Sequence, residues 1–404
     1  MFNHIICRYN EIATKSGNRA MFERRLIDNM RSACSDLETR LRFTRIRGRI
    51  VIFRDEDTEF TEAEKAAISE RLERCFGLDS FSFCLEGEKS MEAIEEMIRK
   101  TVPEMFAPVL EKNGIVQFRT RARRADKSFP VKSKDIEIAV ASMVENLMGE
   151  GKVKVNLDHP DVSIGIEVRE KSSILYYDSA KAAGGLPVGS NAPMLALLSG
   201  GIDSPVACHM TMRRGCHVDY LTFHSYPYTP KGTVEKVERL AKMINRYQNP
   251  PGILYACNIS EIQKLIRDNC DPRYRTVLYR RMMMRIASKL CRDRKLHAVV
   301  TGESIGQVAS QTVENMSVIE KACDHLIVRP LCGFDKMETI RRAEAIGTFE
   351  TSIEPMPDSC TVFAPDSPIL HAKLKFVEFE ESKIPNMEEE LQKAYDSMEV
   401  YLKK

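Results

Sequence analysis

A glycine-rich turn between an apolar run and a helical pattern constrains this chain most. The residues Leu197-Leu198-Ser199-Gly200-Gly201-Ile202-Asp203-Ser204-Pro205 follow the short apolar stretch 194–196. An apolar run of this length is typical of a buried strand, and glycines let a backbone bend and present N–H groups to an anion. Pro205 suits a first helical turn, because a proline there loses no hydrogen bond. The pattern predicts a strand, a phosphate-binding turn and a helix.

The turn differs from two common phosphate-binding patterns, because the chain contains neither Gly-x-x-x-x-Gly-Lys-Ser/Thr nor Gly-x-Gly-x-x-Gly. The string Ser-Gly-Gly-Ile-Asp-Ser at 199–204 resembles instead the PP-loop of ATP pyrophosphatases. These enzymes hold the β and γ phosphates of ATP while a substrate oxygen attacks the α phosphate. Asp203 is a candidate Mg²⁺ ligand, because this ion takes hard oxygen ligands beside phosphates. The alternatives are a tight turn without a ligand and, for Asp203, a helix N-cap.

The length of the chain predicts two or three domains. The chain has 404 residues, of which 43% are hydrophobic, and a net charge of +2. A nucleic-acid surface would therefore have to come from local clusters. The twelve cysteines include no Cys-x-x-Cys pair, so we expect reduced thiols and no zinc site. No run approaches the roughly 20 apolar residues of a membrane span, and the N-terminus lacks a signal-peptide pattern, so we expect a cytoplasmic protein without membrane contact.

Three units follow one another along the chain. Residues 1–60 combine a strand at 5–6, a helix at 19–33 and an extended segment at 40–53 that is interrupted at Gly48. The second unit, 61–172, begins with a capping box at Thr61 and Glu64. It then has strands at 81–85, 115–123 and within 152–177, and helices at 90–100 and 133–148. The third unit, 173–404, alternates apolar runs at 194–198, 218–223, 253–256 and 297–301 with helical ones.

That alternation predicts an α/β domain with a parallel sheet and helices on both faces. Its ligand is expected at the carboxyl ends of the strands. The segment 184–189 is a turn-rich connector, and the tail 371–404 is expected to form one amphipathic helix.

A basic strand marks the second unit. Arg119, Arg121 and Arg123 alternate and so share one face of the expected strand, and Arg124 and Lys127 follow. Guanidinium groups in a row bind phosphates well, although a solvated strand face is the alternative. The segment 122–130 resembles the THUMP RNA-binding domain, which grips the acceptor end of tRNA. The resemblance makes these five residues candidates for tRNA contact.

Three further segments complete the candidate site. The segment 302–315 follows an expected strand and is rich in small residues that allow close backbone approach. Lys336 begins an expected helix, where its ammonium could compensate pyrophosphate charge. Cys360 lies in the segment 357–363, and Arg280 lies on an expected helix. Taken singly, each feature has a structural explanation: a turn at 302–315, a solvated side chain at Lys336, a buried thiol at Cys360 and a basic helix face at Arg280.

Together the motifs resemble the ThiI family of tRNA 4-thiouridine synthetases over nearly the whole chain. The resemblance implies a ferredoxin-like N-terminal domain, a THUMP domain and a doubly wound parallel-sheet PP-loop domain. It implies that ATP adenylates the C4 oxygen of uridine-8 in tRNA and that persulfide sulfur then displaces AMP. It places catalysis at Asp203, Lys336 and Cys360. It places nucleotide contacts at Leu197, Leu198, Ser199, Gly200, Gly201, Asp203, Ser204, Thr222, Phe223, Arg280, Gly302 and Gln311.

The chain departs from many relatives in the parts that handle sulfur. We expect no rhodanese domain, so the resemblance implies a separate cysteine desulfurase, with Cys360 carrying or cleaving the persulfide. Ser359 stands where some relatives have a second cysteine, and the missing Cys-x-x-Cys predicts that there is no iron–sulfur cluster. A role in thiamine biosynthesis and a homodimer are left open. The alternatives are another PP-loop adenylating enzyme and a non-catalytic tRNA-binding protein.

Overall fold

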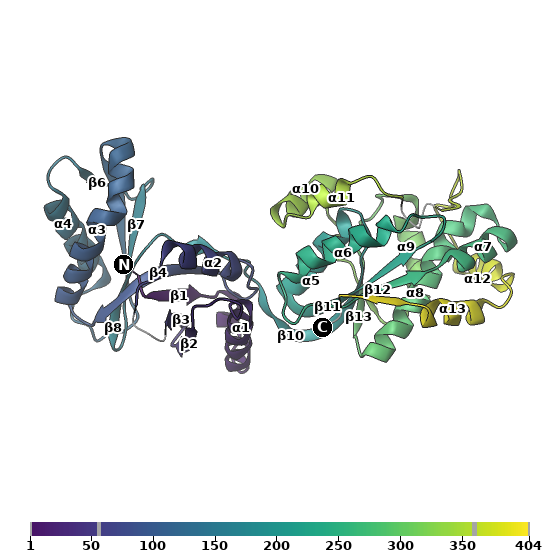
Figure 1. Cartoon of the computed structure of the whole chain (residues 1–404), viewed down its shortest axis with the longest axis horizontal. Helices are drawn as coiled ribbons and strands as arrows, with labels where there is room; N and C mark the ends of the chain where they lie inside the picture. The colour runs from purple at the N-terminus through teal and green to yellow at the C-terminus, as the bar shows by residue number, and fades with distance from the viewer. Residues whose placement is uncertain (1, 55–57, 358–361, 403–404) are drawn as a thin grey trace. The chain divides into compact units, whose positions relative to one another are not determined.

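The computed structural model describes residues 2–54, 58–357 and 362–402. The chain forms two compact units, Met1–Gly185 and Leu186–Lys404 (Figure 1). The domain boundaries expected at 60/61 and 172/173 stay predictions.

One sheet runs through the first unit, with the strand order β2-β3-β1-β4-β8-β7-β5-β6 and with β9 beside β4. Its strand β4 pairs antiparallel with both β1 and β8, so it belongs equally to the two halves of the sheet. The strands are β1 (His4–Arg8), β2 (Leu41–Ile46), β3 (Arg49–Arg54), β4 (Ser80–Glu88), β5 (Val116–Arg124), β6 (Val153–Val155), β7 (Val162–Val168), β8 (Ser172–Tyr177) and β9 (Ala180–Lys181). The helices are α1 (Arg19–Ala33), α2 (Glu62–Leu72), α3 (Met91–Asn113) and α4 (Ser133–Met148).

Local signals account for several of these bounds. Thr61 and Glu64 form the predicted capping box at the start of α2. Gly48 has a φ of +75° between β2 and β3, where a glycine is favoured. The helix expected at 90–100 is longer than predicted, because α3 continues through Pro103 and Pro108. Both prolines are exposed, so the hydrogen bonds that they interrupt lie on the solvent side.

The helices α3 and α4 lie together against one face of the β5–β7–β8 part of the sheet (Figure 1). The core between them includes the fully buried side chains of Phe106, Phe118, Ile136 and Ile164. Burial on this face leaves the alternate side chains of β5 on the opposite face.

The second unit has the predicted parallel sheet, in the order β14-β13-β10-β11-β12-β15. Neither edge strand was predicted: β14 pairs parallel with β13, and β15 pairs antiparallel with β12. The strands are β10 (Leu186–Leu197), β11 (Arg214–His224), β12 (Leu254–Asn258), β13 (Ala298–Val300), β14 (Leu326–Val328) and β15 (Glu399–Tyr401). In register, Leu197 lies beside Leu221 and Leu195 beside Val299, so the two central neighbours of β10 end near the glycine-rich turn.

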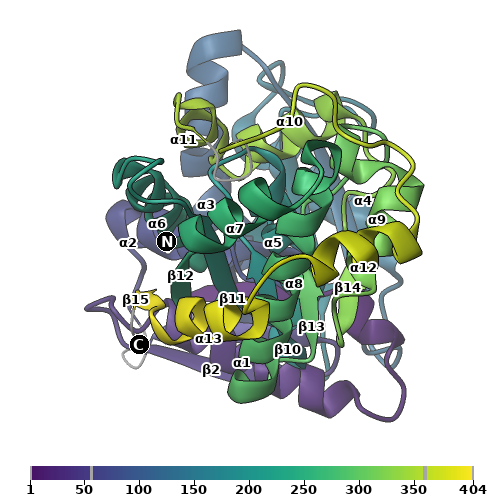
Figure 2. The same cartoon turned by 90° about the vertical axis from the view of Figure 1, so that its right-hand side faces the viewer.

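Helices cover both faces of this sheet. On one side, α5 (Asp203–Arg213) and α6 (Gly232–Asn245) contact the sheet, and α10 (Lys336–Ala345) and α11 (Phe349–Ile353) contact these helices. On the other lie α7 (Ser260–Asn269), α8 (Arg275–Arg294), α9 (Val313–Glu320), α12 (Leu374–Ser382) and α13 (Met387–Asp396). Figure 2 shows α12 and α13 on the side of α8. Leu195, Leu221, Leu278 and Met282 belong to the core between α8 and the sheet.

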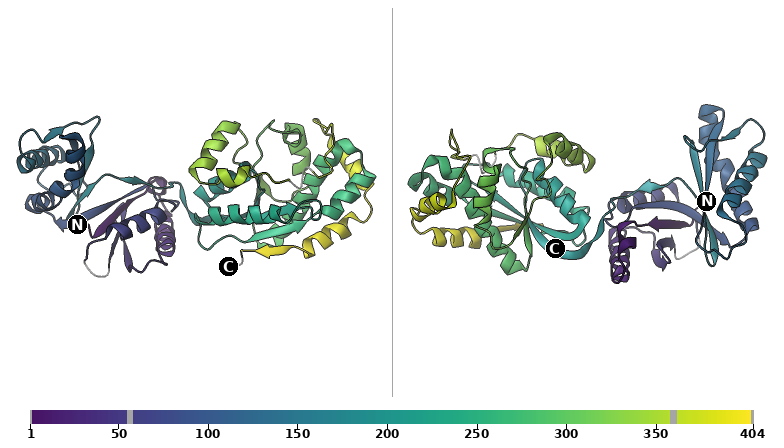
Figure 3. Two further views of the ribbon diagram at one scale, coloured as in Figure 1. Left: turned by 45° about the horizontal axis from the view of Figure 1, so that its top comes forward. Right: turned by 180° about the vertical axis from the view of Figure 1, so that it is seen from behind.

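Two expectations about this unit were wrong. The tail is not one amphipathic helix but α12, α13 and the strand β15, which lies beside the sheet near the C-terminus (Figure 3). Pro385 and Asn386, which has a φ of +52°, separate the two helices. The connector 184–189 is a turn only at Gly184 and Gly185, because β10 begins at Leu186. Among the described residues, no helix combines the length and the apolar character needed to cross a membrane.

Candidate functional site

The turn after β10 is held by its own serines. The Ser199 N–H donates to Ser204 Oγ at 2.9 Å, and the two hydroxyl oxygens are 3.1 Å apart. The helix α5 begins at Asp203, with Ile202 at the N-cap, so Asp203 is not the N-cap that we considered. The predicted strand, turn and helix are confirmed. The first amides of α5 have no partners within the helix and suit an anion.

The space around the glycines of the site differs from one position to the next. Neither Gly200 nor Gly201 has a positive φ, which corrects our reason for their presence. A Cβ atom on Gly200 would lie 3.3 Å from Lys236 Cδ. A Cβ atom on Gly302 would lie 2.8 Å from the backbone nitrogen of Ser204. Gly302 therefore lets the segment after β13 pack directly against the first turn of α5.

A cavity of about 630 Å³ opens at the carboxyl ends of the parallel strands, where ligands of such sheets bind. Every predicted nucleotide-contact residue lines it: Leu197, Leu198, Ser199, Gly200, Gly201, Asp203, Ser204, Thr222, Phe223, Arg280, Gly302 and Gln311. These residues come from separate segments of the sequence, and the fold brings them together. Their individual roles stay predictions.

The Asp203 carboxylate receives two hydrogen bonds from distant segments. Lys336 Nζ donates to Oδ1 at 2.8 Å, and Gln307 Nε2 donates to Oδ2 at 2.9 Å. Lys336 is placed by the capping box of Asp335 and Glu338, which begins α10. Within the described ranges, no group of three or more His, Cys, Asp or Glu side chains could hold a metal ion. A single carboxylate still fits Mg²⁺ that arrives with a nucleotide, because this ion keeps several waters and binds phosphates.

A buried carboxylate orients Arg280. Glu303 is only 2% exposed. Its Oε1 accepts from Arg280 Nη1 at 3.1 Å, and its Oε2 accepts from Arg329 Nε at 2.9 Å. Burial alone would lower the pKa of Arg329, but the charges of Glu303 and Glu320 raise it. Arg280 is thus fixed at the cavity wall and is not part of a solvated helix face, which was the alternative.

The cavity lining also includes residues that were not among the predicted contacts, and Lys236, Glu303 and Gln307 are three polar examples. Glu303 and Gln307 stand in the motif 302–315, which the sequence had already marked. Lys236 lies on α6 beside the apolar positions Val237 and Leu240. A lysine on the apolar stripe of an amphipathic helix is unusual, and this signal could have identified it.

Cys360 lies outside the described residues, as does Ser359. The chain lines the cavity on both sides of this gap, at Pro357 and at Ala364. In the described parts of the chain every cysteine has a free thiol.

The basic strand β5 has the predicted alternation. Arg121 and Arg123 are exposed, whereas Phe118, which precedes Arg119, and Thr120, which precedes Arg121, are buried. Arg119 belongs to the same face and donates from Nε to Ser163 Oγ at 2.9 Å. Arg124 Nη1 donates to the Phe129 carbonyl oxygen at 2.7 Å and so holds the following loop. Lys127 lies exposed in that loop.

The ring of Tyr176 on β8 lies over Gly165 of β7, the strand that pairs with β5. Gly165 pairs with Tyr176 across β7 and β8, and a Cβ atom at 165 would lie 2.2 Å from the Tyr176 ring. The Arg8 guanidinium stands over the ring at 4.4 Å from its centroid. Buried Glu167 lies next to Arg49 at 3.1 Å and Arg169 at 2.6 Å. Burial opposes ionisation of Glu167, but the arginine charges outweigh burial and lower its pKa.

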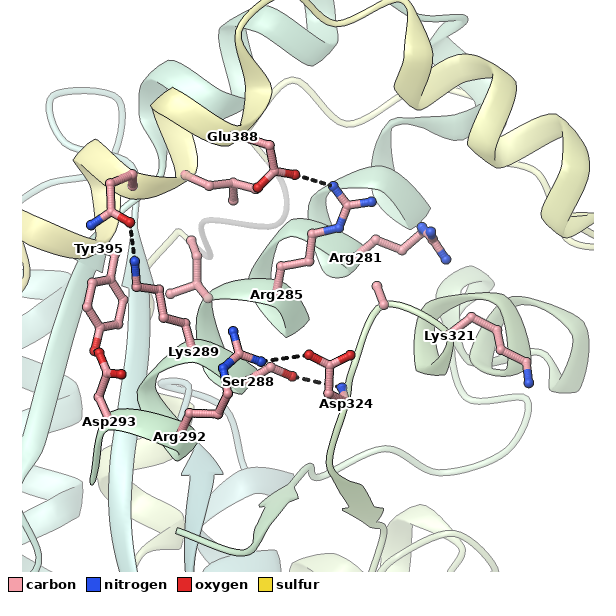
Figure 4. Close-up of a pocket in the computed structure, with 14 residues that line it drawn as sticks. Arg281, Arg285, Ser288, Lys289, Arg292, Asp293, Lys321, Asp324, Glu388 and Tyr395 are labelled. Atoms are coloured by element: carbon pink, nitrogen blue, oxygen red, sulfur yellow. Dashed lines mark hydrogen bonds and ion pairs between the residues drawn. The ribbon is translucent and has the colours of Figure 1, made fainter. Parts of the chain in front are cut away.

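A second cavity of about 500 Å³ lies between α8, α13 and the segment that joins α9 to β14. Its arginines form ion pairs within the protein, two of which are seen in Figure 4. Arg292 binds Asp324 at 2.6 Å, and Arg285 lies 2.7 Å from Glu381 and 3.6 Å from Glu388. Glu381 also accepts from the buried Arg281. The ion pairs of Arg281 and Arg285 therefore hold α12 and α13 against α8.

Three family models match three successive parts of the chain. Residues 189–385 match the family model described as thiamine biosynthesis protein (ThiI). Residues 4–82 match the ThiI ferredoxin-like domain, and residues 88–178 match the THUMP domain.

Similarity to individual proteins extends over the full length. The chain is 38% identical to a "Probable tRNA sulfurtransferase" of Alkaliphilus oremlandii, covering 99% of this chain and 98% of the relative. It is 36% identical to a relative of the same description from Finegoldia magna, covering 98% of each. Among solved structures, a 4-thiouridine synthetase–RNA complex with bound ATP matches with a TM-score of 0.87 and 32% identity, covering all of both chains.

Proposed function

The chain belongs to the ThiI family of tRNA sulfurtransferases, and on that premise we propose that it converts uridine-8 of tRNA to 4-thiouridine at the expense of ATP. The observation that carries this proposal is the cavity around the Asp203–Lys336 pair, which gathers all the residues expected to contact the nucleotide. The similar solved structure, which holds both RNA and ATP, supports it.

The nucleotide enters with its phosphates on the glycine-rich turn. The free amides at the start of α5 and the positive end of its dipole stabilise phosphate charge. Apolar wall residues such as Leu197, Phe223 and Met283 suit the adenine ring. When bound, Mg²⁺ would neutralise phosphate charge beside Asp203.

Activation of the uridine requires attack of its C4 oxygen on the α phosphorus of ATP, with pyrophosphate leaving. Lys336 can release Asp203 and pair with the departing pyrophosphate, because Asp203 lines the cavity and Lys336 is hydrogen-bonded to it. Positioned charge of this kind stabilises a transition state without reorganisation. The oxygen at C4 then leaves as part of AMP when a sulfur nucleophile attacks C4.

Sulfur reaches C4 as persulfide from a cysteine desulfurase: the outer sulfur attacks C4 as AMP leaves, a thiol then cleaves the S–S bond to release 4-thiouridine, and an external thiol reduces the disulfide that remains. Cys360 is either the acceptor that carries the persulfide or the thiol that cleaves it. The position of Pro357 and Ala364 on the cavity wall supports this role, since they flank the segment that contains Cys360. A thiolate is the form that reacts in either step.

The tRNA would contact the basic face of the first unit, with Arg119, Arg121 and Arg123 on phosphates. At the cavity in the second unit, Val308 is 49% exposed and Met356 is 39% exposed. Exposed apolar side chains beside a polar cavity suit an unstacked base.

The decisive experiment supplies purified protein with Mg²⁺, ATP, an unmodified tRNA transcript and sodium sulfide. Sulfide carries sulfur at the oxidation level of the product, so no reductant is needed. We expect AMP, pyrophosphate and 4-thiouridine in equal amounts, with the nucleoside identified by mass spectrometry. A transcript with cytidine at position 8 is the matched control. Absence of 4-thiouridine with intact ATP would contradict the proposal.

A further inference from the structure

A buried ammonium group faces the glycine-rich turn from α6. Lys236 is 3% exposed, and its side chain passes Gly200, where an added Cβ atom would lie 3.3 Å from Cδ and 3.6 Å from Nζ. The same lysine lines the cavity with Ser199, Gly200 and Gly201. Its charge therefore lies beside the atoms that would surround a phosphate.

Among the described residues, the hydrogen-bond partners of the Lys236 ammonium are neutral carbonyl groups. Its Nζ donates to the carbonyl oxygens of Ser352 at 2.9 Å and of Glu354 at 2.7 Å. The Glu354 carboxylate adds a favourable charge nearby, but both of its oxygens accept hydrogen bonds from Arg239. An ammonium has three N–H donors, so these contacts leave one donor of Lys236 without a partner among the contacts described.

A buried charge without an ion pair is costly, and proteins retain such charges where a ligand supplies the counter-charge. Burial lowers the pKa of Lys236 and the nearby Arg239 lowers it further, whereas Glu354 raises it. Here the cavity is open beside the ammonium, and the adjacent turn has the features of an anion site. An anionic oxygen at the turn would complete the coordination of Nζ.

We infer that Lys236 is a phosphate ligand of this site and binds the pyrophosphate portion of the nucleotide. This inference rests on the proposed use of ATP and extends it by a residue that also holds the segment 352–354. Because Nζ binds those two carbonyl oxygens, phosphate binding and the position of the chain that leads to Pro357 depend on the same side chain. Lys236 thereby links nucleotide occupancy to the segment that precedes Cys360.

The test compares ligands of different charge on Lys236→Met, which keeps the length of the apolar stem. Calorimetry should show ATP affinity reduced roughly 10- to 100-fold, the loss expected for one charge-assisted hydrogen bond. Affinity for AMP should change less than threefold, because AMP lacks the pyrophosphate portion. Lys242→Met is the matched control, since Lys242 lies on the same helix, is exposed and pairs with Glu238. It should bind both nucleotides as the wild type does.

The outcomes separate the two claims. If the wild-type protein fails to bind ATP, the proposed function fails. If the wild type binds ATP and Lys236→Met binds it equally well, the inference about Lys236 is wrong. Equal losses for ATP and AMP would show a purely structural lysine and would also overturn it. If the methionine variant does not fold, Lys236→Gln keeps a donor for the carbonyl oxygens, and the same ratio of ATP to AMP affinity decides.

Discussion

Lys336 Nζ lies 2.8 Å from Asp203 Oδ1, although the two residues are 133 positions apart in the sequence. Their side chains are 45% and 22% exposed, so the pair contributes at most about 1 kcal/mol to stability. A weak pair beside the proposed nucleotide cavity can separate at low cost. The carboxylate is then free for Mg²⁺ and the ammonium for phosphate.

Replacement of either partner should therefore abolish activity without unfolding the protein. We expect Asp203→Asn and Lys336→Met each to reduce thiolation by at least about 100-fold, as for loss of one group that stabilises transition-state charge. The double variant should lose less than the product of the single losses, because both groups act on one step. Nucleoside mass spectrometry measures the rates, and tRNA binding should persist in all three variants. Normal turnover in Asp203→Asn would remove this carboxylate from the mechanism.

We expect substitutions of Arg121 and Arg124 on the basic strand β5 to have different effects. Arg121→Ala should weaken tRNA binding and make the salt dependence shallower by roughly 0.7 to 0.9 in log–log slope for one lost phosphate contact. Arg124→Ala should instead lower the melting temperature of the protein, because Arg124 holds the Phe129 carbonyl oxygen. Arg99→Ala is a surface control, since Arg99 pairs with Glu95 on α3. A slope for Arg121→Ala equal to that of the wild type would exclude the contact.

Site residues could be predicted from the sequence where a chemical motif also determines the local backbone structure. The turn at 199–204 has a strand before it and a helix after it, so local sequence patterns were sufficient to identify its residues. The neighbours of β10 could be placed together because parallel strands end at one edge of a sheet. Lys336 and Asp203 were each identified from a sequence motif, but the contact between them could be seen only in the folded chain.

Other features depend on packing that no local pattern encodes. Gly302 is needed because its backbone meets Ser204, about 100 residues away, and the sequence offers only a small residue as a signal. The strand β15 was missed because three residues after a helix carry little pattern, and only pairing with β12 defines them. Residues 371–404 therefore appeared to be one helix when helical period alone was considered.

Sulfur transfer provides a test of Cys360. We expect Cys360→Ser to lose thiolation when a cysteine desulfurase and cysteine supply the sulfur, because the serine hydroxyl cannot form a persulfide. With sodium sulfide as the donor, the variant should keep its activity, since sulfide attacks C4 directly. Cys332→Ser is the matched control, because Cys332 is a free, partly exposed thiol of the same unit. Wild-type rates with both donors would exclude a role for Cys360.

Stability of the second unit should decrease in acid through His209 on α5. Burial, together with the charges of Arg213 and Arg342, lowers the pKa of His209 from 6.5 to about 4, and its ring packs edge-on against Tyr247. Between these values the unfolded chain binds a proton that the folded chain excludes, so the folded state loses stability as pH falls from 6.5 towards 4. The full effect is about 3 kcal/mol and is absent above pH 6.5.

His209→Phe keeps a ring against Tyr247 but removes the titrating group. Hydrogen exchange of the α5 amides, corrected for intrinsic rates, measures the opening free energy of this helix at pH 7 and pH 4.5. The wild type should lose more of that free energy between the two pH values than the variant does, by about 2 to 3 kcal/mol. Equal losses in the two proteins would mean that His209 titrates alike in the folded and unfolded chains, and the acid sensitivity of α5 would then have to arise from other groups.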